Sequence, residues 1–157
     1  MDKIEIINLA DEPEHLEEVA RWIWEEWDGK KGTWTIDEVV YRTKHSILKD
    51  RVPMTFIAKC NGQLAGCQAL WNCDLKARQD LEPWGACFFV KKEFRGKGVD
   101  RALTRHSVEV ARRLGYEYLY FWSEHKNYYE RMKDVEYMEQ VPLGFGEWTN
   151  LYRVRLA

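Results

Sequence analysis

Glycines and basic side chains are interleaved in one short segment of this chain, residues 95–101, and that combination can bind an anion. The segment carries Gly96 and Gly98 together with three cations, Arg95, Lys97 and Arg101. An uncharged, mostly apolar run precedes it at 84–90, and apolar residues with helical spacing follow it. The glycines therefore lie where a strand becomes a helix. Because the first backbone N–H groups of a helix lack intrahelical partners, such a junction suits a phosphate or pyrophosphate.

Two common phosphate-binding motifs do not fit this segment. A P-loop needs Gly-Lys followed by Ser or Thr, but Lys97 is followed by Gly98 and Val99. A dinucleotide fingerprint needs three spaced glycines in an early strand–helix–strand unit, whereas this chain has two glycines placed late. An ordinary solvated loop between a strand and a helix stays open as the alternative.

The segment resembles the acyl-CoA-binding motif of the GNAT N-acetyltransferase superfamily, which is Arg/Gln-x-x-Gly-x-Gly/Ala after a strand. Arg95 and Gly98 match its spacing, but Asp100 stands where the family has Gly or Ala. A carboxylate among pyrophosphate-binding amides would repel the anion. We therefore expect acetyl-CoA as co-substrate, with Asp100 opposing its binding.

A second family signature resembles residues 127–132, where an Asn precedes a short helix that contains two adjacent tyrosines. The resemblance implies that Tyr129 is the general acid that protonates the departing thiolate, and that Asn127 contacts the pantetheine. A phenol suits this role, since its ordinary pKa of about 10 exceeds the thiol's value of about 8.5. The Gly-Phe that follows in the family is replaced by residues 133–135. Tyr129 can also be interpreted as a core tyrosine.

The resemblance implies where the cofactor lies. The pantetheine would lie between strands 84–91 and 116–122, which splay apart in this family. A backbone N–H near Phe89 or Val90 would polarise the acetyl carbonyl. The implied backbone contacts are Phe89, Val90 and Lys91, and the implied pyrophosphate contacts are Arg95, Gly96, Lys97, Gly98, Val99, Asp100 and Arg101.

The general base is less well defined by the sequence. Glu124 and His125 end the strand at 116–122, and Asp80 and Glu82 lie in the connector before strand 84–91. No spacing rule chooses among them, and a water chain can also serve; Glu124 is our candidate. Cys87 lacks a nearby Cys-His-acid arrangement, so we expect direct attack by the amine in a ternary complex.

Aromatic and acidic residues gather near the first helix, where the family builds its acceptor pocket. Trp24, Trp27 and Glu26 are the candidate substrate contacts, because aromatic faces and carboxylates together suit a cationic amine. At helical spacing, some of these tryptophans can instead belong to the core. A polyamine, an aminoglycoside-like amine and a peptide amine all fit this pattern.

The elements expected from the sequence follow the order β-α-α-β-β-β-α-β-α-β-β, which resembles the GNAT fold from end to end. We expect an α/β protein with a mixed sheet, formed as one GNAT N-acetyltransferase domain over residues 1–157. Asn61-Gly62 predicts a hairpin turn, and Thr35 with Glu38 predicts a helical capping box. The expected strands are 3–9, 53–60, 63–71, 84–91, 116–122, 135–141 and 148–156, and the expected helices are 11–27, 35–48, 102–114 and 128–132.

Composition narrows the function classes. The net charge of −2 argues against a nucleic-acid-binding surface, and no apolar run approaches the about 20 residues of a membrane span. The N-terminus lacks the long apolar stretch of a signal peptide, so we expect a cytoplasmic protein. The four cysteines form no Cys-x-x-Cys pair, and we interpret them as structural thiols with no metal site.

Together these features predict an N-acetyltransferase that moves acetyl from acetyl-CoA to a primary amine of a small molecule or peptide. The alternative is a catalytically weakened GNAT-fold module that binds acyl-CoA or regulates, with Asp100 and the missing Gly-Phe as its signs. An interaction domain without a cofactor is a third class. A homodimer is compatible with the family, but no stretch specifies one.

Overall fold

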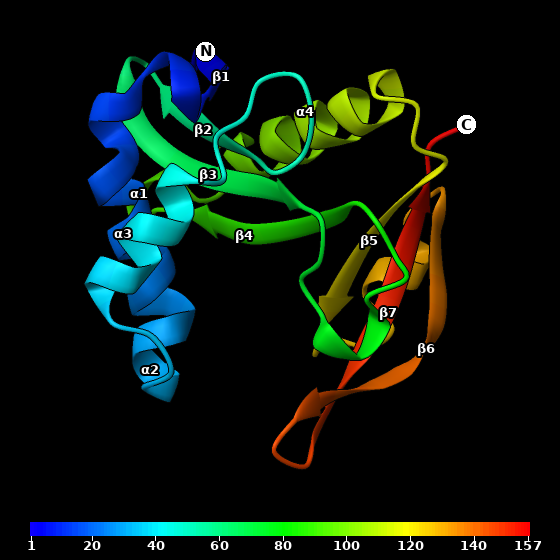
Figure 1. Ribbon diagram of the computed structural model, residues 1–157. Coiled ribbons are helices and arrows are strands. Elements are labelled where there is room, and N and C mark those ends of the chain that lie inside the picture. Colours follow the sequence, from blue (N-terminus) through cyan, green and yellow to red (C-terminus); the bar gives the residue numbers. More distant parts are fainter.

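The computed structural model describes residues 1–157, and its centre is one seven-stranded mixed sheet (Figure 1). The strand order is β1-β2-β3-β4-β5-β7-β6. All neighbouring strands are antiparallel except β4 and β5, which are parallel. The strands are β1 Ile4–Asn8, β2 Met54–Cys60, β3 Gln63–Trp71, β4 Trp84–Val90, β5 Tyr118–Ser123, β6 Val135–Gly144 and β7 Glu147–Arg155. The element order and mixed sheet confirm the predicted fold class.

Helices cover both faces of the sheet. The helices are α1 Leu16–Ile23, α2 Gly29–Lys31, α3 Ile36–Lys44 and α4 Val99–Arg113. Figure 1 shows α1 to α3 on one side and α4 on the other. Strand β2 separates two core clusters, because Phe56 belongs to the cluster that contains Leu103 of α4, whereas Ile57 belongs to the cluster that contains Val39 of α3. Every helix is too short or too polar to cross a membrane.

The first helix does not break where the sequence predicted. It continues from α1 through a π-helical turn, Trp24–Asp28, into α2, and ends at Gly32, which has a φ of 64°. A Cβ atom on Gly29 would lie 2.8 Å from Cε2 of Trp24. Gly29 therefore admits the Trp24 indole against the backbone, and Gly32 ends the helix in the left-handed conformation.

Helix α3 begins as predicted and ends earlier than predicted. The capping box is present, with Thr35 N–H donating to Glu38 Oε2 at 2.7 Å and Glu38 N–H donating to Thr35 Oγ1 at 3.2 Å. The last helical residue is Lys44 rather than Leu48. The chain turns because Ser46 Oγ donates to the Arg42 carbonyl, while the Ser46 carbonyl accepts a hydrogen bond from Thr55 Oγ1 of β2.

Two further boundaries differ near the C-terminus. The expected helix at 128–132 is only a 3₁₀ turn, Tyr129–Arg131. Strand β6 continues to Gly144, so the expected loop at 142–146 is reduced to a tight turn at Phe145 and Gly146. Pro142 is tolerated within this strand because β6 lies at the edge of the sheet.

Strands β4 and β5 diverge, and this divergence opens the sheet. The only register pair between them is Trp84 with Tyr120, where Tyr120 N–H donates to the Pro83 carbonyl at 3.0 Å. In Figure 1 the two strands start side by side and then run apart. Cys87 forms a bulge in β4, with a φ of 52°, and the register with β3 shifts there. Beyond Gly85, the β5-facing edge of β4 therefore has no strand partner.

Candidate active site

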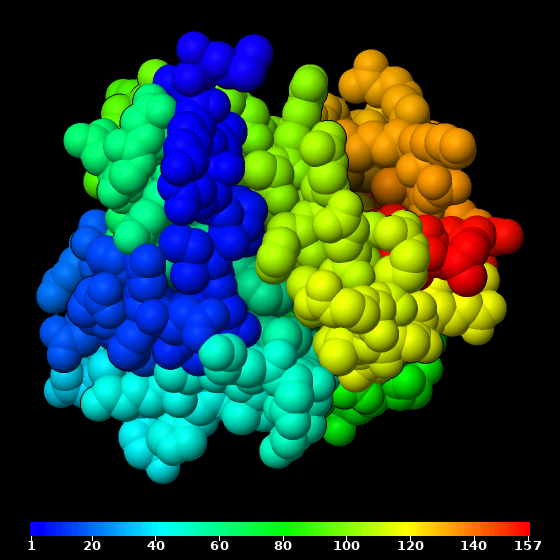
Figure 2. Space-filling view, turned by 90° about the horizontal axis from the view of Figure 1, so that it is seen from above, coloured from blue at the N-terminus to red at the C-terminus, as the bar shows by residue number.

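The N-terminus of α4 offers bare backbone amides. Gly98 is its N-cap residue with a φ of 88°, and no side chain caps the helix. Gly96 has a φ of 78°, and a Cβ atom placed there would meet no atom within 4 Å. Left-handed backbone explains both glycines, and the open space leaves the first-turn amides accessible to an anion. Figure 2 shows α4, in yellow-green, between the N-terminal segment in blue and the C-terminal strands in orange and red.

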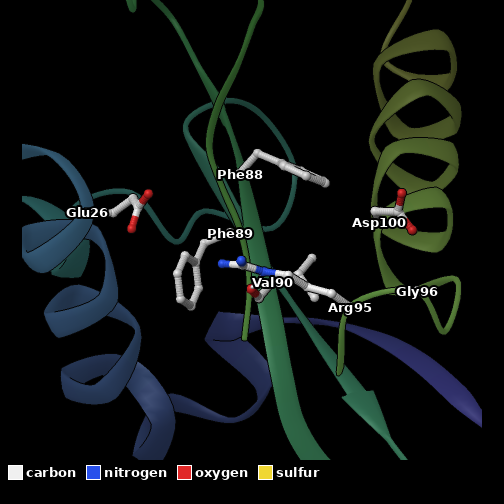
Figure 3. A pocket seen from close by; sticks show the side chains of 7 residues that line it. All are labelled: Glu26, Phe88, Phe89, Val90, Arg95, Gly96 and Asp100. Carbon is white, nitrogen blue, oxygen red and sulfur yellow. Dashed lines mark hydrogen bonds between the residues drawn. The ribbon is translucent and has the colours of Figure 1, made fainter. Parts of the chain in front are cut away.

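An open cavity of about 280 Å³ lies between this helix end and β4 (Figure 3). Its lining residues are Glu26, Phe88, Phe89, Val90, Arg95, Gly96 and Asp100. Five of the predicted cofactor contacts are thus brought together with Glu26, a predicted acceptor contact. Phe88 was missed by the sequence analysis, because the bulge at Cys87 that changes the alternation of β4 has no sequence signal of its own.

Arg95 connects the glycine segment to β4. Its Nε donates a hydrogen bond to the Val90 carbonyl at 3.1 Å, and Figure 3 shows its side chain crossing the cavity towards Phe89. This contact places a permanent positive charge beside the free strand edge. Lys97 and Arg101 are exposed and add two further cations around the helix end.

The other two predicted contacts in this region have structural partners. Lys91 Nζ forms an ion pair with Glu93 at 3.3 Å, and the Lys91 N–H donates to the Ala65 carbonyl. The Val99 side chain is buried in the core packed against α4. Only the backbone of Val99 is therefore available to a ligand.

Asp100 is the second residue of α4 and borders the cavity. Figure 3 shows it on the opposite side of the cavity from Glu26, so two carboxylates flank the space that Arg95 crosses. A carboxylate in the first turn stabilises a helix through the helix dipole. Asp100 therefore has a structural benefit at the position where it would repel an anionic ligand.

Tyr129 lies outside this cavity. Its ring packs on Phe121 of β5 and on Tyr152 of β7, with centroid distances of 4.9 Å and 5.3 Å. It lines a separate cavity with His125, Lys126 and Tyr128. The structure therefore does not bring Tyr129 together with the residues around Arg95. Glu124 and Asn127 are exposed and line neither cavity.

Comparisons with known proteins agree with this arrangement of strands and glycines. A model of the acetyltransferase (GNAT) family matches residues 16–132. The chain belongs to the GNAT family. No curated protein matches the chain significantly in sequence.

Solved structures share the GNAT fold over nearly the whole chain. An acetyltransferase from Streptococcus agalactiae is 18% identical, with 98% of each chain covered and a TM-score of 0.66. A Salmonella typhimurium protein, solved with its cofactor acetyl-CoA, is 16% identical, with 99% of this chain and 94% of that chain covered and a TM-score of 0.70. An aminoglycoside 6'-acetyltransferase is 11% identical, with 99% and 97% covered and a TM-score of 0.71.

The two tryptophans predicted to bind substrate make structural contacts in this GNAT chain. Trp24 Nε1 donates to the Trp34 carbonyl at 3.0 Å, which ties the π-helical turn to the start of α3. Trp27 packs against the core cluster between α1, α3 and the sheet. Of the three predicted acceptor contacts, Glu26 alone lines the cavity beside α4.

Asp80 and Glu82, the candidate bases in the connector before β4, are exposed and form polar contacts with neighbouring side chains. Asp80 pairs with Arg78 at 2.8 Å, and hydrogen bonds from that guanidinium lower the pKa of Asp80. Glu82 Oε1 accepts a hydrogen bond from Asn72 at 2.8 Å. Both carboxylates are therefore stabilised by partners that a base would have to share.

A different acid of the same connector is placed where the strands diverge. Asp74 Oδ2 accepts a hydrogen bond from Trp122 Nε1 of β5 at 2.9 Å. Burial raises the pKa of Asp74 to about 7, although this hydrogen bond opposes the shift. Asp74 is not recognisable from the sequence, because nothing in a polar connector distinguishes it from its acidic neighbours.

Cys87 is held as a neutral thiol. Burial raises its pKa well above the usual value, and the nearby Asp74 charge adds to the effect. A protonated thiol is a poor nucleophile. The cysteines, Cys60, Cys67, Cys73 and Cys87, are all free.

Proposed function

We propose that this GNAT chain transfers acetyl from acetyl-CoA to a primary amine of a small molecule or peptide. The observation that carries the proposal is the unpaired edge of β4 leading to the uncapped N-terminus of α4. An extended ligand that ends in a pyrophosphate fits both features, because one offers strand-like hydrogen bonds and the other offers helix-end amides. Family membership and the acetyl-CoA in the Salmonella typhimurium structure support this choice of ligand.

Different residues of the chain bind the pyrophosphate and the pantetheine arm of acetyl-CoA. The amides from Gly96 to Arg101 hold the pyrophosphate, with Lys97 and Arg101 supplying charge. The backbone of Phe89 and Val90 pairs with the pantetheine arm, whereas the N–H and the carbonyl of Lys91 already pair with Ala65 and Phe94. Asn127 contacts the arm from the β5 side. The open space around Gly96 and the left-handed φ of Gly98 fit this use, because a side chain at either position would crowd or strain the cradle.

Acetyl-CoA supplies an activated acetyl group, and the protein orients it. A backbone N–H at Phe89 or Val90 donates to the carbonyl oxygen and stabilises the negative charge that develops there. Tyr129, which packs on Phe121 of β5, donates its hydroxyl proton to the departing sulfur. The neutral thiol of Cys87 supports direct attack by the amine in a ternary complex rather than an acyl-cysteine intermediate.

The acceptor is an amine drawn in by negative charge. Glu26 lies on the π-helical turn, across the cavity from α4, and attracts an ammonium group from that side (Figure 3). Trp24 and Trp27 shape the helix that carries it. One structure with this fold is an aminoglycoside acetyltransferase, so an aminoglycoside belongs in the set of amines to be tried.

A second candidate function is an acyl-CoA-binding or regulatory module. It is favoured by Asp100, whose carboxylate borders the cavity at the position where the pyrophosphate would lie. The two candidates differ in turnover. We expect calorimetric binding of acetyl-CoA by the native protein, and release of free CoA thiol when a diamine, an aminoglycoside or a tripeptide is added. Binding without thiol release across these amines would instead establish the module.

A further inference from the structure

The gap between β4 and β5 is also bordered by the connector between β3 and β4. Cys87 and Trp122 lie just beyond the last paired position of the two strands. Asp74 accepts the hydrogen bond from Trp122 at 2.9 Å, and it is close enough to Cys87 for its charge to raise the pKa of that thiol. The carboxyl group of Asp74 is therefore placed between the two diverging strands.

Charged groups from α3 and the π-helical turn lie close enough to this carboxyl group to act on it. Arg42 of α3 forms an ion pair with Asp28 at 2.8 Å. The Arg42 guanidinium lies over the rings of Trp34 and Trp71, at 5.0 Å and 4.9 Å from their centroids. The charges of Arg42 and Asp28 both act on Asp74, in opposite directions.

Two buried donors beside this cluster have no hydrogen-bond partner. They are Nε of Arg42 and Nε1 of Trp71. Buried polar atoms in folded proteins are nearly always satisfied, and an unsatisfied donor carries a cost of roughly 1–3 kcal/mol. A ligand that carries an oxygen acceptor near its amine would satisfy them. This observation is independent of the charge on Asp74 and also indicates a ligand on the α3 side of the sheet.

We propose that Asp74 is the base that removes the proton from the acceptor ammonium, and that the acceptor enters between β4 and β5 from the side of α3. The proposal rests on the function proposed above. It places the acceptor opposite α4, so that the two substrates approach the splayed strands from different faces. Attack on the acetyl carbonyl then needs no movement of either substrate past the other.

The proton inventory of the step is balanced. Asp74 takes one proton from the ammonium, and the freed electron pair of nitrogen forms the C–N bond. The C–S bond breaks, its electron pair leaves on sulfur, and the second proton lost by nitrogen ends on that sulfur through Tyr129. Asp74 afterwards releases its proton to water. A carboxyl group with a pKa of about 7 suits this exchange, since the best base has a pKa near the working pH.

Asp74 is better placed for this role than the residue predicted from the sequence. Glu124 follows the end of β5 and is exposed, with no polar side chain fixing its carboxylate. Asp74 has its orientation fixed by Trp122 and its acidity set by burial. A fixed and desolvated carboxylate is a stronger base than a solvated one.

The test compares Asp74→Asn with the native protein and with Asp50→Asn. Asp50 is an exposed acid that pairs with its neighbour Arg51, so the control makes the same change away from the sheet. Thiol release is measured with acetyl-CoA and a panel of a diamine, an aminoglycoside, an amino acid and a tripeptide. The pH dependence of kcat/KM is then followed from pH 5.5 to 9.5 with the amine that reacts fastest, and acetyl-CoA binding is measured by calorimetry.

We expect native kcat/KM to rise about tenfold per pH unit and to level off near pH 7. Asp74→Asn should lose about 10²- to 10⁴-fold in rate. Its residual rate should keep rising towards the pKa of the amine, while its acetyl-CoA affinity stays native. If Asp74 had only a structural role, its replacement would not shift the pH range over which kcat/KM rises. An unchanged pH range in Asp74→Asn would overturn the inference alone. A native protein that binds acetyl-CoA but acetylates no amine would overturn the proposed function and the inference with it.

Discussion

Replacing Asp100 by Ala tests whether the N-terminus of α4 binds the pyrophosphate. The change restores a residue type that the GNAT motif has at this position and removes a carboxylate that borders the cavity. We expect acetyl-CoA to bind more tightly, because the pyrophosphate would no longer face a like charge. The fold should tolerate the change, since Asp100 is exposed and caps no backbone group through its side chain.

The size of the effect follows from Coulomb's law. Two charges about 7 Å apart in a water-like medium interact by about 0.6 kcal/mol, so two phosphate charges are opposed by about 1.2 kcal/mol. This corresponds to a roughly eightfold tighter Kd. Loss of the favourable contact with the helix dipole should cost about 0.3–1 kcal/mol of stability. The variant should therefore bind better and melt slightly earlier.

Calorimetry at low and high salt supplies the assay. The gain should shrink at about 1 M salt, where the Debye length is only about 3 Å. Glu109→Ala is the matched control, because it removes a carboxylate from the exposed face of the same helix about 13 Å further along. Equal or weaker binding by Asp100→Ala would refute the reasoning, since Asp100 would then contact the ligand favourably or the pyrophosphate would lie elsewhere.

Three further predictions concern single side chains. Gly98→Ala should lose about 1–2 kcal/mol of stability in urea unfolding, because the φ of 88° at Gly98 disfavours a side chain, although an added Cβ would lie 3.8 Å from the nearest atom. The same change should weaken acetyl-CoA binding. Native stability of this variant would contradict a strained backbone. Tyr129→Phe should keep its packing on Phe121, and hence its melting temperature, but lose about 10²-fold or more in turnover; native turnover would exclude Tyr129 as the acid. Folding raises the pKa of Asp74 to about 7, so the contribution of Asp74 to stability is complete below its unfolded pKa of about 4 and is lost as the pH rises to 7. In urea unfolding, the native protein should therefore become less stable relative to Asp74→Asn over that pH range. A constant difference in stability between the two proteins would disprove the shift.

Local signals in the sequence were enough to predict the sheet and the glycine-rich turn. Asn61-Gly62 determines its hairpin and Thr35 its capping box, because the atoms involved lie within a few residues of each other. The left-handed backbone at the start of α4 is likewise a local feature, because it depends on the glycine at position 98 itself. Such features depend on short stretches of chain, and the sequence displays them directly.

Contacts between distant residues explain what the sequence could not predict. Gly29 reads as a helix breaker, but it makes room for the indole of Trp24 and the helix continues as a π-helical turn. Asp74 reads as one acid in a polar connector, and its character comes from Trp122, which lies 48 residues away. The same holds for Phe88, which reaches the cavity because of a bulge at Cys87.

Hydrogen exchange with and without acetyl-CoA shows whether the co-substrate binds along β4 and at the N-terminus of α4. We expect acetyl-CoA to slow exchange of the backbone amides along the free edge of β4 and in the first turn of α4, over residues 86–101. Free CoA should protect the same amides. Absence of protection at saturating acetyl-CoA, or protection confined to other segments, would contradict the assignment of the cofactor site and with it the proposed reaction.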